Sequence, residues 1–138
     1  MDKKIIWTNG CFDILHRGHI ELFKYARSLG SELYVGIDSD EKVKLDKGSS
    51  RPFNNLEDRV TMLESIKYIN KVFVFDSAEH LEFLIESITP DVMVIGSDWK
   101  GKTVIGESHT NQLEFFDRIG NYSTTRILNE KITKNNAR

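Results

Sequence analysis

The sequence predicts an α/β protein: a single-domain, doubly wound parallel sheet of about five strands, with helices on both faces. The chain has 138 residues, a length typical of one domain. Short apolar runs alternate along it with segments in which apolar residues recur at helical spacing. Apolar strands that alternate with helices belong to parallel sheets covered on both faces, and the right-handed crossover rule then limits the topology to a Rossmann-like sandwich.

Five short apolar runs predict the strands. Each is four or five residues long and bounded by polar or turn-forming residues, as expected for strands buried on both faces. The predicted strands are 5–8, 33–37, 72–75, 92–95 and 113–116.

Four segments predict the helices. Gly30 is a favourable residue to end the first helix. Asn55 is the expected N-cap of the second helix, Asp76 or Ser77 that of the third, and Ser123 that of the last. The polar segment 38–55, rich in lysine, predicts a loop with at most a short helical turn. The predicted helices run from 18 to 29, from 56 to about 66, from 77 to before Pro90, and from 124 to about 132. We expect one domain over residues 1–133, followed by a tail, 134–138, that frays.

Composition narrows the class of function. The formal net charge is -2, which argues against a general nucleic-acid binder. No apolar stretch approaches the ~18 residues of a transmembrane helix, and the N-terminus lacks the apolar core of a signal peptide. Cys11 is the one cysteine, so an intramolecular disulfide is excluded. We expect a cytoplasmic protein with neither a nucleic-acid nor a membrane partner.

The segment after the first predicted strand carries the densest group of candidate site residues. Its sequence is G-C-F-D-I-L-H-R-G-H, from Gly10 to His19. Gly10 allows a tight turn, which directs the backbone N–H groups of Cys11 and Phe12 toward an anion. His16 and His19 fall at the start of a helix, where the positive end of the dipole suits a polyphosphate.

The two histidines have alternative explanations. They would donate hydrogen bonds to phosphate oxygens and offset charge that develops in a transition state, while Gly18 keeps side-chain bulk away from the nucleotide. A chance pair and a zinc site are the alternatives. Zinc requires further Cys or His ligands, and the residues around Cys11 are better explained as a turn. We therefore predict a phosphate-binding segment and no protein metal site.

The run from Gly10 to His19 resembles the signature of the cytidylyltransferase-like nucleotidyltransferases, in which an H-x-G-H motif binds the triphosphate. The resemblance extends over nearly the whole chain. It implies transfer of a nucleotidyl group from an NTP to a phosphorylated polyol or sugar, with release of pyrophosphate. It also implies a homodimer. Mg²⁺ is expected to arrive with the nucleotide and needs no dedicated protein cage; Asp13 is a candidate contact for it.

A basic segment follows the second predicted strand. Its pattern, K-x-x-K-G-x-x-R-P-x-N-x-L-x-x-R from Lys44, is similar to that of the adenylyltransferase domains that make ADP-activated heptose. The resemblance implies that Lys44, with Lys42 or Lys47, clamps the acceptor phosphate or the α-phosphate. It also implies that Arg51 and Arg59 hold phosphate or substrate. The alternatives are a solvated charge run and a salt bridge between Arg59 and a nearby glutamate.

Two further blocks divide between subfamilies. The run G-S-D-W-K-G-K, which holds Asp98 and Trp99, resembles the glycerol-3-phosphate cytidylyltransferases, whereas the following V-I-G resembles the heptose type. Trp99 would stack on a base or close the pocket; the alternative is an ordinary packing residue. Asp98 would cap a local turn or bind a hydroxyl group. Arg118, Ser123 and Thr124 resemble the family's second motif, which holds the nucleotide's phosphates. A plain helix cap is the alternative for the serine and threonine.

The resemblance implies in-line attack of a substrate phosphate oxygen on the α-phosphorus, without a covalent enzyme intermediate. Arg118 matches a cytidylyltransferase arginine, so CTP with glycerol 3-phosphate is the first expectation and ATP with a heptose 1-phosphate the alternative. Both families supply precursors of cell-surface polysaccharide. A nucleotide-binding module without turnover is disfavoured by His16, His19 and Lys44. A dehydrogenase is disfavoured because a single Gly10, not G-x-G-x-x-G, follows the first strand.

Overall fold

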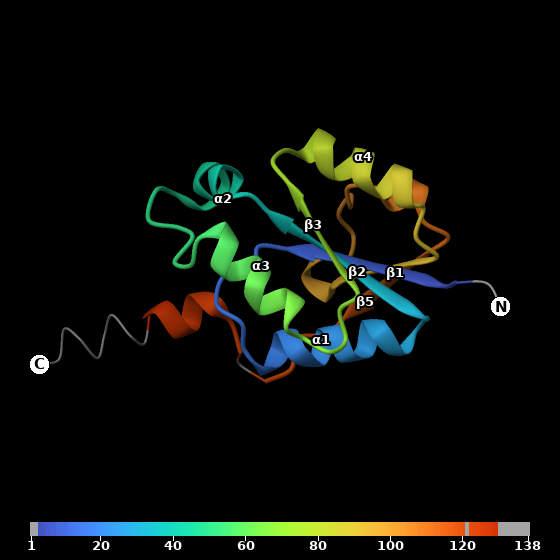
Figure 1. The fold of residues 1–138 in the computed structure, drawn as a ribbon, viewed down its shortest axis with the longest axis horizontal. Helices are drawn as coiled ribbons and strands as arrows, with labels where there is room; N and C mark the ends of the chain where they lie inside the picture. The colour runs from blue at the N-terminus through green and yellow to red at the C-terminus, as the bar shows by residue number, and fades with distance from the viewer. Residues whose placement is uncertain (1–2, 121, 130–138) are drawn as a thin grey trace, which may run out of the picture.

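The computed structural model describes residues 3–120 and 122–129 and contains one five-stranded parallel sheet (Figure 1). The strand order is β3-β2-β1-β4-β5, and every neighbouring pair is parallel. The predicted α/β class and the five strands are therefore confirmed. The strands are β1 (Ile5–Gly10), β2 (Glu32–Asp38), β3 (Lys71–Phe75), β4 (Val92–Gly96) and β5 (Gln112–Phe116).

The helices begin where the sequence supplies a capping side chain. Asn55, Ser77 and Ser123 each accept a hydrogen bond from a backbone N–H three residues later, at 2.9, 3.0 and 3.0 Å. The last helix is described over residues 124–129; its predicted end and the tail 134–138 lie outside the described residues. The longer helices are α1 (Arg17–Ser28), α2 (Asp40–Lys47), α3 (Leu56–Glu64) and α4 (Ala78–Ile88), and two short 3₁₀ turns are η1 (Ser97–Trp99) and η2 (Glu107–His109).

Helix α2 corrects the prediction of a loop with a short helical turn. It is eight residues long, and its N-cap is Ser39, whose hydroxyl accepts from the N–H of Lys42 at 3.2 Å. Val43 is its one buried residue. A helix that buries a single side chain has no amphipathic pattern by which the sequence alone would identify it.

Successive strand residues point to opposite faces of the sheet and form two cores. Ile6 packs in one core and Trp7 in the other. The first core is closed by Phe23 of α1 and Leu63 of α3, and the second by Ile85 of α4. Figure 1 shows α1 and α4 on opposite sides of the sheet. The prediction of helices on both faces is confirmed.

Two observations place the site at the carboxyl ends of β1 and β4. Strand β1 pairs with β2 through six residue pairs, from Ile5 to Gly10, but with β4 through two, at Ile6 and Trp7. The two strands therefore separate toward their carboxyl ends. This is also where the strand order reverses, the place at which open α/β sheets bind ligands. Among the described residues, none of the helices combines the length and hydrophobicity of a membrane span.

Candidate active site

A pocket of about 310 Å³ lies at the carboxyl ends of β1 and β4. It gathers residues from the segment after β1, the start of α1, the segment after α2, the end of β4 and the segment after β5. Every site residue predicted from sequence lies in its wall except Lys44, Arg59 and Trp99. The predicted residues that line it are Gly10, Cys11, Phe12, His16, Gly18, His19, Lys47, Arg51, Asp98, Arg118, Ser123 and Thr124.

The two histidines cap α1 and stack on each other. His16 is the N-cap, and its Nδ1 accepts from the N–H of Gly18 at 3.1 Å. Nδ1 of His19 accepts in return from the N–H of His16 at 3.2 Å. The imidazole centroids are 3.9 Å apart, with 29° between the planes. Tyr122, which sequence reasoning missed, also stacks with His16, with ring centroids 5.9 Å apart.

This hydrogen bonding fixes the tautomer of both rings. A ring nitrogen that accepts a hydrogen bond carries no proton, so each neutral ring carries its proton on Nε2. Burial, followed by the charge of Arg118, lowers the pKa of His16. Burial, followed by the charges of His16 and Lys47, lowers the pKa of His19 to about 3. At neutral pH the pocket of the free protein therefore holds two neutral Nε2–H donors.

Cations surround these donors. Lys47, Arg51 and Arg118 line the same pocket, and the first turn of α1 carries no acidic residue. The pocket therefore combines neutral N–H donors, positive charge and a helix N-terminus, three features that favour an anion with several oxygens.

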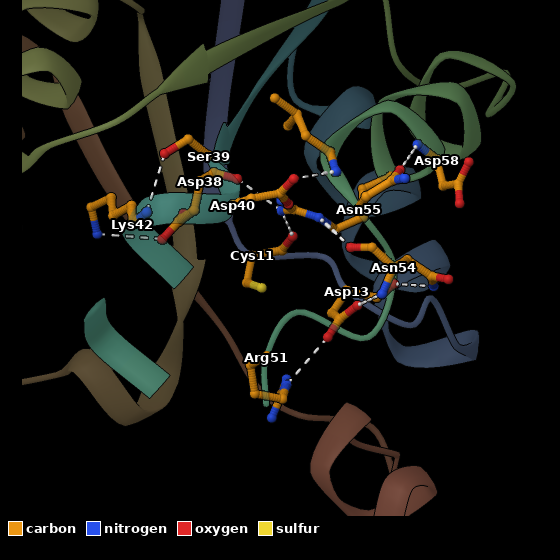
Figure 2. Close-up of polar contacts among 12 residues, drawn as sticks. Cys11, Asp13, Asp38, Ser39, Asp40, Lys42, Arg51, Asn54, Asn55 and Asp58 are labelled. Carbon is orange, nitrogen blue, oxygen red and sulfur yellow. Dashed lines mark hydrogen bonds and ion pairs between the residues drawn. The ribbon is translucent and has the colours of Figure 1, made fainter. Parts of the chain in front are cut away.

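Arg59 corrects the expectation of direct substrate contact. Its side chain is completely buried and lies beneath the pocket, outside its lining. Nη1 donates to the carbonyls of Cys11 at 3.0 Å and Asp38 at 2.8 Å, and Nε donates to that of Asn54 at 3.0 Å. Nη2 pairs with Oδ1 of Asp40 at 2.7 Å. Figure 2 shows these four acceptor residues meeting from different segments. The guanidinium positions the segments and has no face toward a ligand.

Asp40 is the counterion of this arginine. Burial alone would raise the pKa of Asp40, but its hydrogen bonds to Arg59 and to the N–H of Leu56, with the charge of Arg59, lower it. The sequence had offered a nearby glutamate as the alternative partner of Arg59, whereas the structure selects an aspartate nineteen positions earlier in the chain.

Asp13 connects the loop after β1 to the segment before α3 through hydrogen bonds. Its Oδ2 accepts from Nε of Arg51 at 3.2 Å, and its Oδ1 accepts from the N–H of Asn54 at 2.8 Å (Figure 2). Oδ2 also accepts from the N–H of Phe53 at 2.8 Å. Asp13 is 3% exposed. Its carboxylate is committed to positioning Arg51 and does not fit the expected contact with Mg²⁺. Over residues 3–120 and 122–129, no group of three acidic, histidine or cysteine side chains is placed to hold a metal.

A second pocket of about 380 Å³ adjoins the first. The two share Gly10, Cys11, Lys47 and Gly96. Apolar side chains form most of its wall, and three charged side chains form one polar edge. The apolar residues are Phe75, Leu81, Met93, Ile95, Trp99, Val104 and Ile105, and the charged edge is Asp38, Lys42 and Asp46.

Three lysines of the segment after β2 have different positions. Lys44 is exposed on α2 and lines neither pocket, so its catalytic role stays a prediction. Lys47 lines both pockets. Lys42 lies between Asp38, at 3.3 Å, and Asp46, at 2.6 Å. Burial would lower the pKa of Lys42, but its bonds to these two carboxylates raise it.

Trp99 and Asp98 lie side by side in η1 but face different pockets. Trp99 lines the second pocket and is 50% exposed, so it is placed to cover that pocket rather than to stack in the first. Asp98 lines the first pocket. A Cβ at Gly96 would lie 2.8 Å from Oδ1 of Asp98, so a larger residue here would displace the Asp98 carboxylate.

The family model described as "Cytidylyltransferase-like" matches residues 7–129. The chain belongs to this family, which places it among nucleotidyltransferases and explains why an H-x-G-H segment opens α1 beneath a polar pocket. The fold agrees with the match. A lipopolysaccharide core biosynthesis protein from Thermoplasma volcanium superposes with a TM-score of 0.69 at 24% identity, over 88% of this chain and all of that one.

The curated relatives are longer proteins. "Bifunctional protein HldE" of Campylobacter concisus is 44% identical over 91% of this chain, and that of Campylobacter jejuni strain RM1221 is 44% identical over 95%. The chain spans 26% and 28% of their respective lengths. A pantoate-beta-alanine ligase from Francisella tularensis, in complex with an ATP analogue and β-alanine, shares the fold at a TM-score of 0.58 and 14% identity, over 91% of this chain and 68% of that one.

Replacing Arg59 by methionine is expected to lower the free energy of unfolding by about 3 kcal/mol or more, because Asp40 and three carbonyls lose a buried partner. Urea unfolding measures the change. Arg17→Met is the matched control: Arg17 is 69% exposed, pairs with Glu21 at 3.6 Å, and its loss is expected to cost less than about 0.5 kcal/mol. An Arg59→Met protein as stable as wild type but unable to bind substrate would restore the direct role predicted from sequence.

Acidification is expected to destabilise the protein through His19. Its pKa is about 3 in the folded state, against an ordinary value of 6.5. Below pH 6.5 the unfolded chain therefore binds a proton that the folded chain does not, and stability falls by at most about 1.4 kcal/mol per pH unit. Urea unfolding at about pH 6.5 and pH 5 measures the loss. We expect a smaller loss in His19→Gln and an unchanged loss in His80→Gln, whose side chain is 40% exposed. Equal losses of stability in the wild type, His19→Gln and His80→Gln would contradict the burial of neutral His19.

Proposed function

We propose that this chain transfers the adenylyl group of ATP to a sugar 1-phosphate and releases pyrophosphate. The observation that carries the proposal is the stacked pair His16–His19, which presents two Nε2–H donors at the start of α1 inside a cationic pocket. The first pocket takes the triphosphate. The second takes the sugar. Lys47 and the backbone at Gly10 and Cys11 lie at their junction, where the reacting phosphates meet.

The reaction needs positioning and charge stabilisation. A phosphate oxygen of the acceptor substrate attacks the α-phosphorus, the bond from that phosphorus to the bridging oxygen breaks, and pyrophosphate leaves. The nucleophile is already an anion, so no general base is required. The Nε2–H groups of His16 and His19 donate to phosphate oxygens as negative charge moves toward the leaving group. Lys47 and Arg118 neutralise the phosphates on either side. Mg²⁺ would be held by the phosphates of the nucleotide itself.

Two observations support ATP and a sugar phosphate over CTP and glycerol 3-phosphate, which reverses the order expected from sequence. The relatives named "Bifunctional protein HldE" are 41–44% identical to this chain, and the basic segment that starts at Lys44 resembles the adenylyltransferase domains that make ADP-activated heptose. The second pocket, at about 380 Å³ with an apolar face and one polar edge, suits a sugar ring better than a three-carbon chain. Arg118 lines the first pocket and serves a triphosphate with either base. The homodimer and the cytoplasmic location stay predictions.

Pyrophosphate release over a grid of four NTPs and several phosphorylated acceptors tests the proposal. With Mg²⁺ present, we expect release with ATP and a heptose 1-phosphate or a related sugar 1-phosphate. Release confined to CTP with glycerol 3-phosphate would contradict the choice of substrates. NTP binding without release for any acceptor would instead favour a nucleotide-binding module.

The His16→Ala substitution tests the role of the histidine pair in the same assay. It is expected to lower kcat by ~100-fold or more, since one donor to the transition state is lost. His109→Ala is the matched control, because His109 lines neither pocket and its Nε2 lies 3.5 Å from Oε1 of Glu82. A near-normal kcat in His16→Ala would remove this histidine from its proposed role.

A further inference from the structure

Three charged side chains form the polar edge of the second pocket. Asp38 ends β2, and Lys42 and Asp46, four residues apart on α2, lie on one side of that helix. Nζ of Lys42 is 3.3 Å from Oδ2 of Asp38 and 2.6 Å from Oδ2 of Asp46. We call Asp38, Lys42 and Asp46 the acidic triad. All three line the second pocket, which they share with the apolar wall opposite.

Two carboxylates occupy most of the hydrogen-bonding capacity of the Lys42 ammonium group. This group has three N–H donors. Two are taken by the carboxylates of Asp38 and Asp46, and the group also lies over the ring of Phe75, 5.6 Å from its centroid. Phe75 belongs to the apolar wall of the same pocket. The lysine thus orients two carboxylates and offsets part of their charge, which explains how two acidic residues lie together in a pocket proposed for an anionic substrate.

The acidic triad carries a net charge of −1. Each carboxylate keeps lone pairs beyond those that Lys42 uses, and carboxylate oxygens accept hydrogen bonds from hydroxyl or ammonium groups. The other charged residue of this pocket, Lys47, lies in the part shared with the first pocket. Positive charge is therefore placed at the junction and negative charge farther along the polar edge.

We propose that the acidic triad determines the class of acceptor substrate: one phosphate at the junction, and a hydroxylated or amino-substituted body that bears no second negative charge. This rests on the proposed function, because it assigns the second pocket to the acceptor. The apolar wall packs against the C–H face of the sugar, and the triad binds its hydroxyl groups. A carboxylated or doubly phosphorylated sugar would bring an anion against Asp38 and Asp46.

A series of three ligands that differ at one carbon tests the proposal. Glucose 1-phosphate has a hydroxyl at C6, glucuronic acid 1-phosphate a carboxylate, and 6-amino-6-deoxyglucose 1-phosphate an ammonium group. Calorimetric titration of each into protein saturated with a non-hydrolysable ATP analogue gives three Kd values. We expect glucuronic acid 1-phosphate to bind roughly tenfold more weakly than glucose 1-phosphate, as repulsion between unit charges in a partly solvated pocket requires. The amino sugar is expected to bind at least as tightly as glucose 1-phosphate.

Substitutions in the triad show whether its charge is the cause. Asp46→Asn, at a side chain that is 50% exposed, brings the triad to zero charge and is expected to reduce the discrimination to less than about threefold. Lys42→Gln brings the charge of the triad to −2 and is expected to increase the ratio of the Kd for glucuronic acid 1-phosphate to that for glucose 1-phosphate. Lys42→Arg is expected to restore the wild-type ratio. Asp58→Asn is the matched control: Asp58 is exposed on α3, lines neither pocket, and its loss is expected to leave all three Kd values unchanged.

Each outcome decides a different statement. Equal binding of the glucose and glucuronic acid compounds, or a discrimination that Asp46→Asn leaves unchanged, would overturn the role of the triad while leaving adenylyl transfer intact. Binding of none of the three, together with pyrophosphate release for glycerol 3-phosphate, would overturn both the sugar class of acceptor and this inference. Discrimination that follows the charge of the triad supports both.

Discussion

The buried guanidinium of Arg59 is the interaction on which the site depends. It joins four segments that are far apart in the chain: the loop after β1, the end of β2, the start of α2 and the segment before α3. Burying a cation is costly, and this one is offset by three carbonyls and the carboxylate of Asp40. Because both pockets take residues from these segments, the arginine sets the distance between the residues that hold the triphosphate and those that line the second pocket.

The histidine pair shows how one hydrogen-bond pattern serves both fold and chemistry. Nδ1 of His16 and of His19 satisfy two backbone N–H groups that the start of a helix leaves without partners. This use of Nδ1 leaves Nε2 as the proton-bearing atom, so capping α1 also prepares the two donors for an anion. Phe12 packs edge-on against His19, with centroids 5.5 Å apart, and holds the inner ring of the stack. The sequence pattern that marks a helix start is therefore also the pattern that marks the site.

The sequence predicted the fold and most of the first pocket because those signals are local. Strands buried on both faces are continuous apolar runs, caps are single side chains, and the residues from Gly10 to His19 are contiguous. The sequence could not tell what Arg59, Lys42 and Lys44 contact, because a basic residue looks the same in sequence whether it faces solvent, a carboxylate or a ligand. The second pocket escaped prediction because its wall combines side chains from β2, β4, α2, α4 and the segment around η1.

The central claim is that the nucleotide is cleaved between its α- and β-phosphates and that the α-phosphorus moves to the acceptor. Parallel reactions with ATP labelled with ³²P at the α or at the γ position, each with a sugar 1-phosphate, test it most directly. The account predicts that the α label appears in a sugar nucleotide that phosphatase does not degrade, and that the γ label appears in pyrophosphate. A γ label found in the sugar would identify phosphoryl transfer and contradict the account.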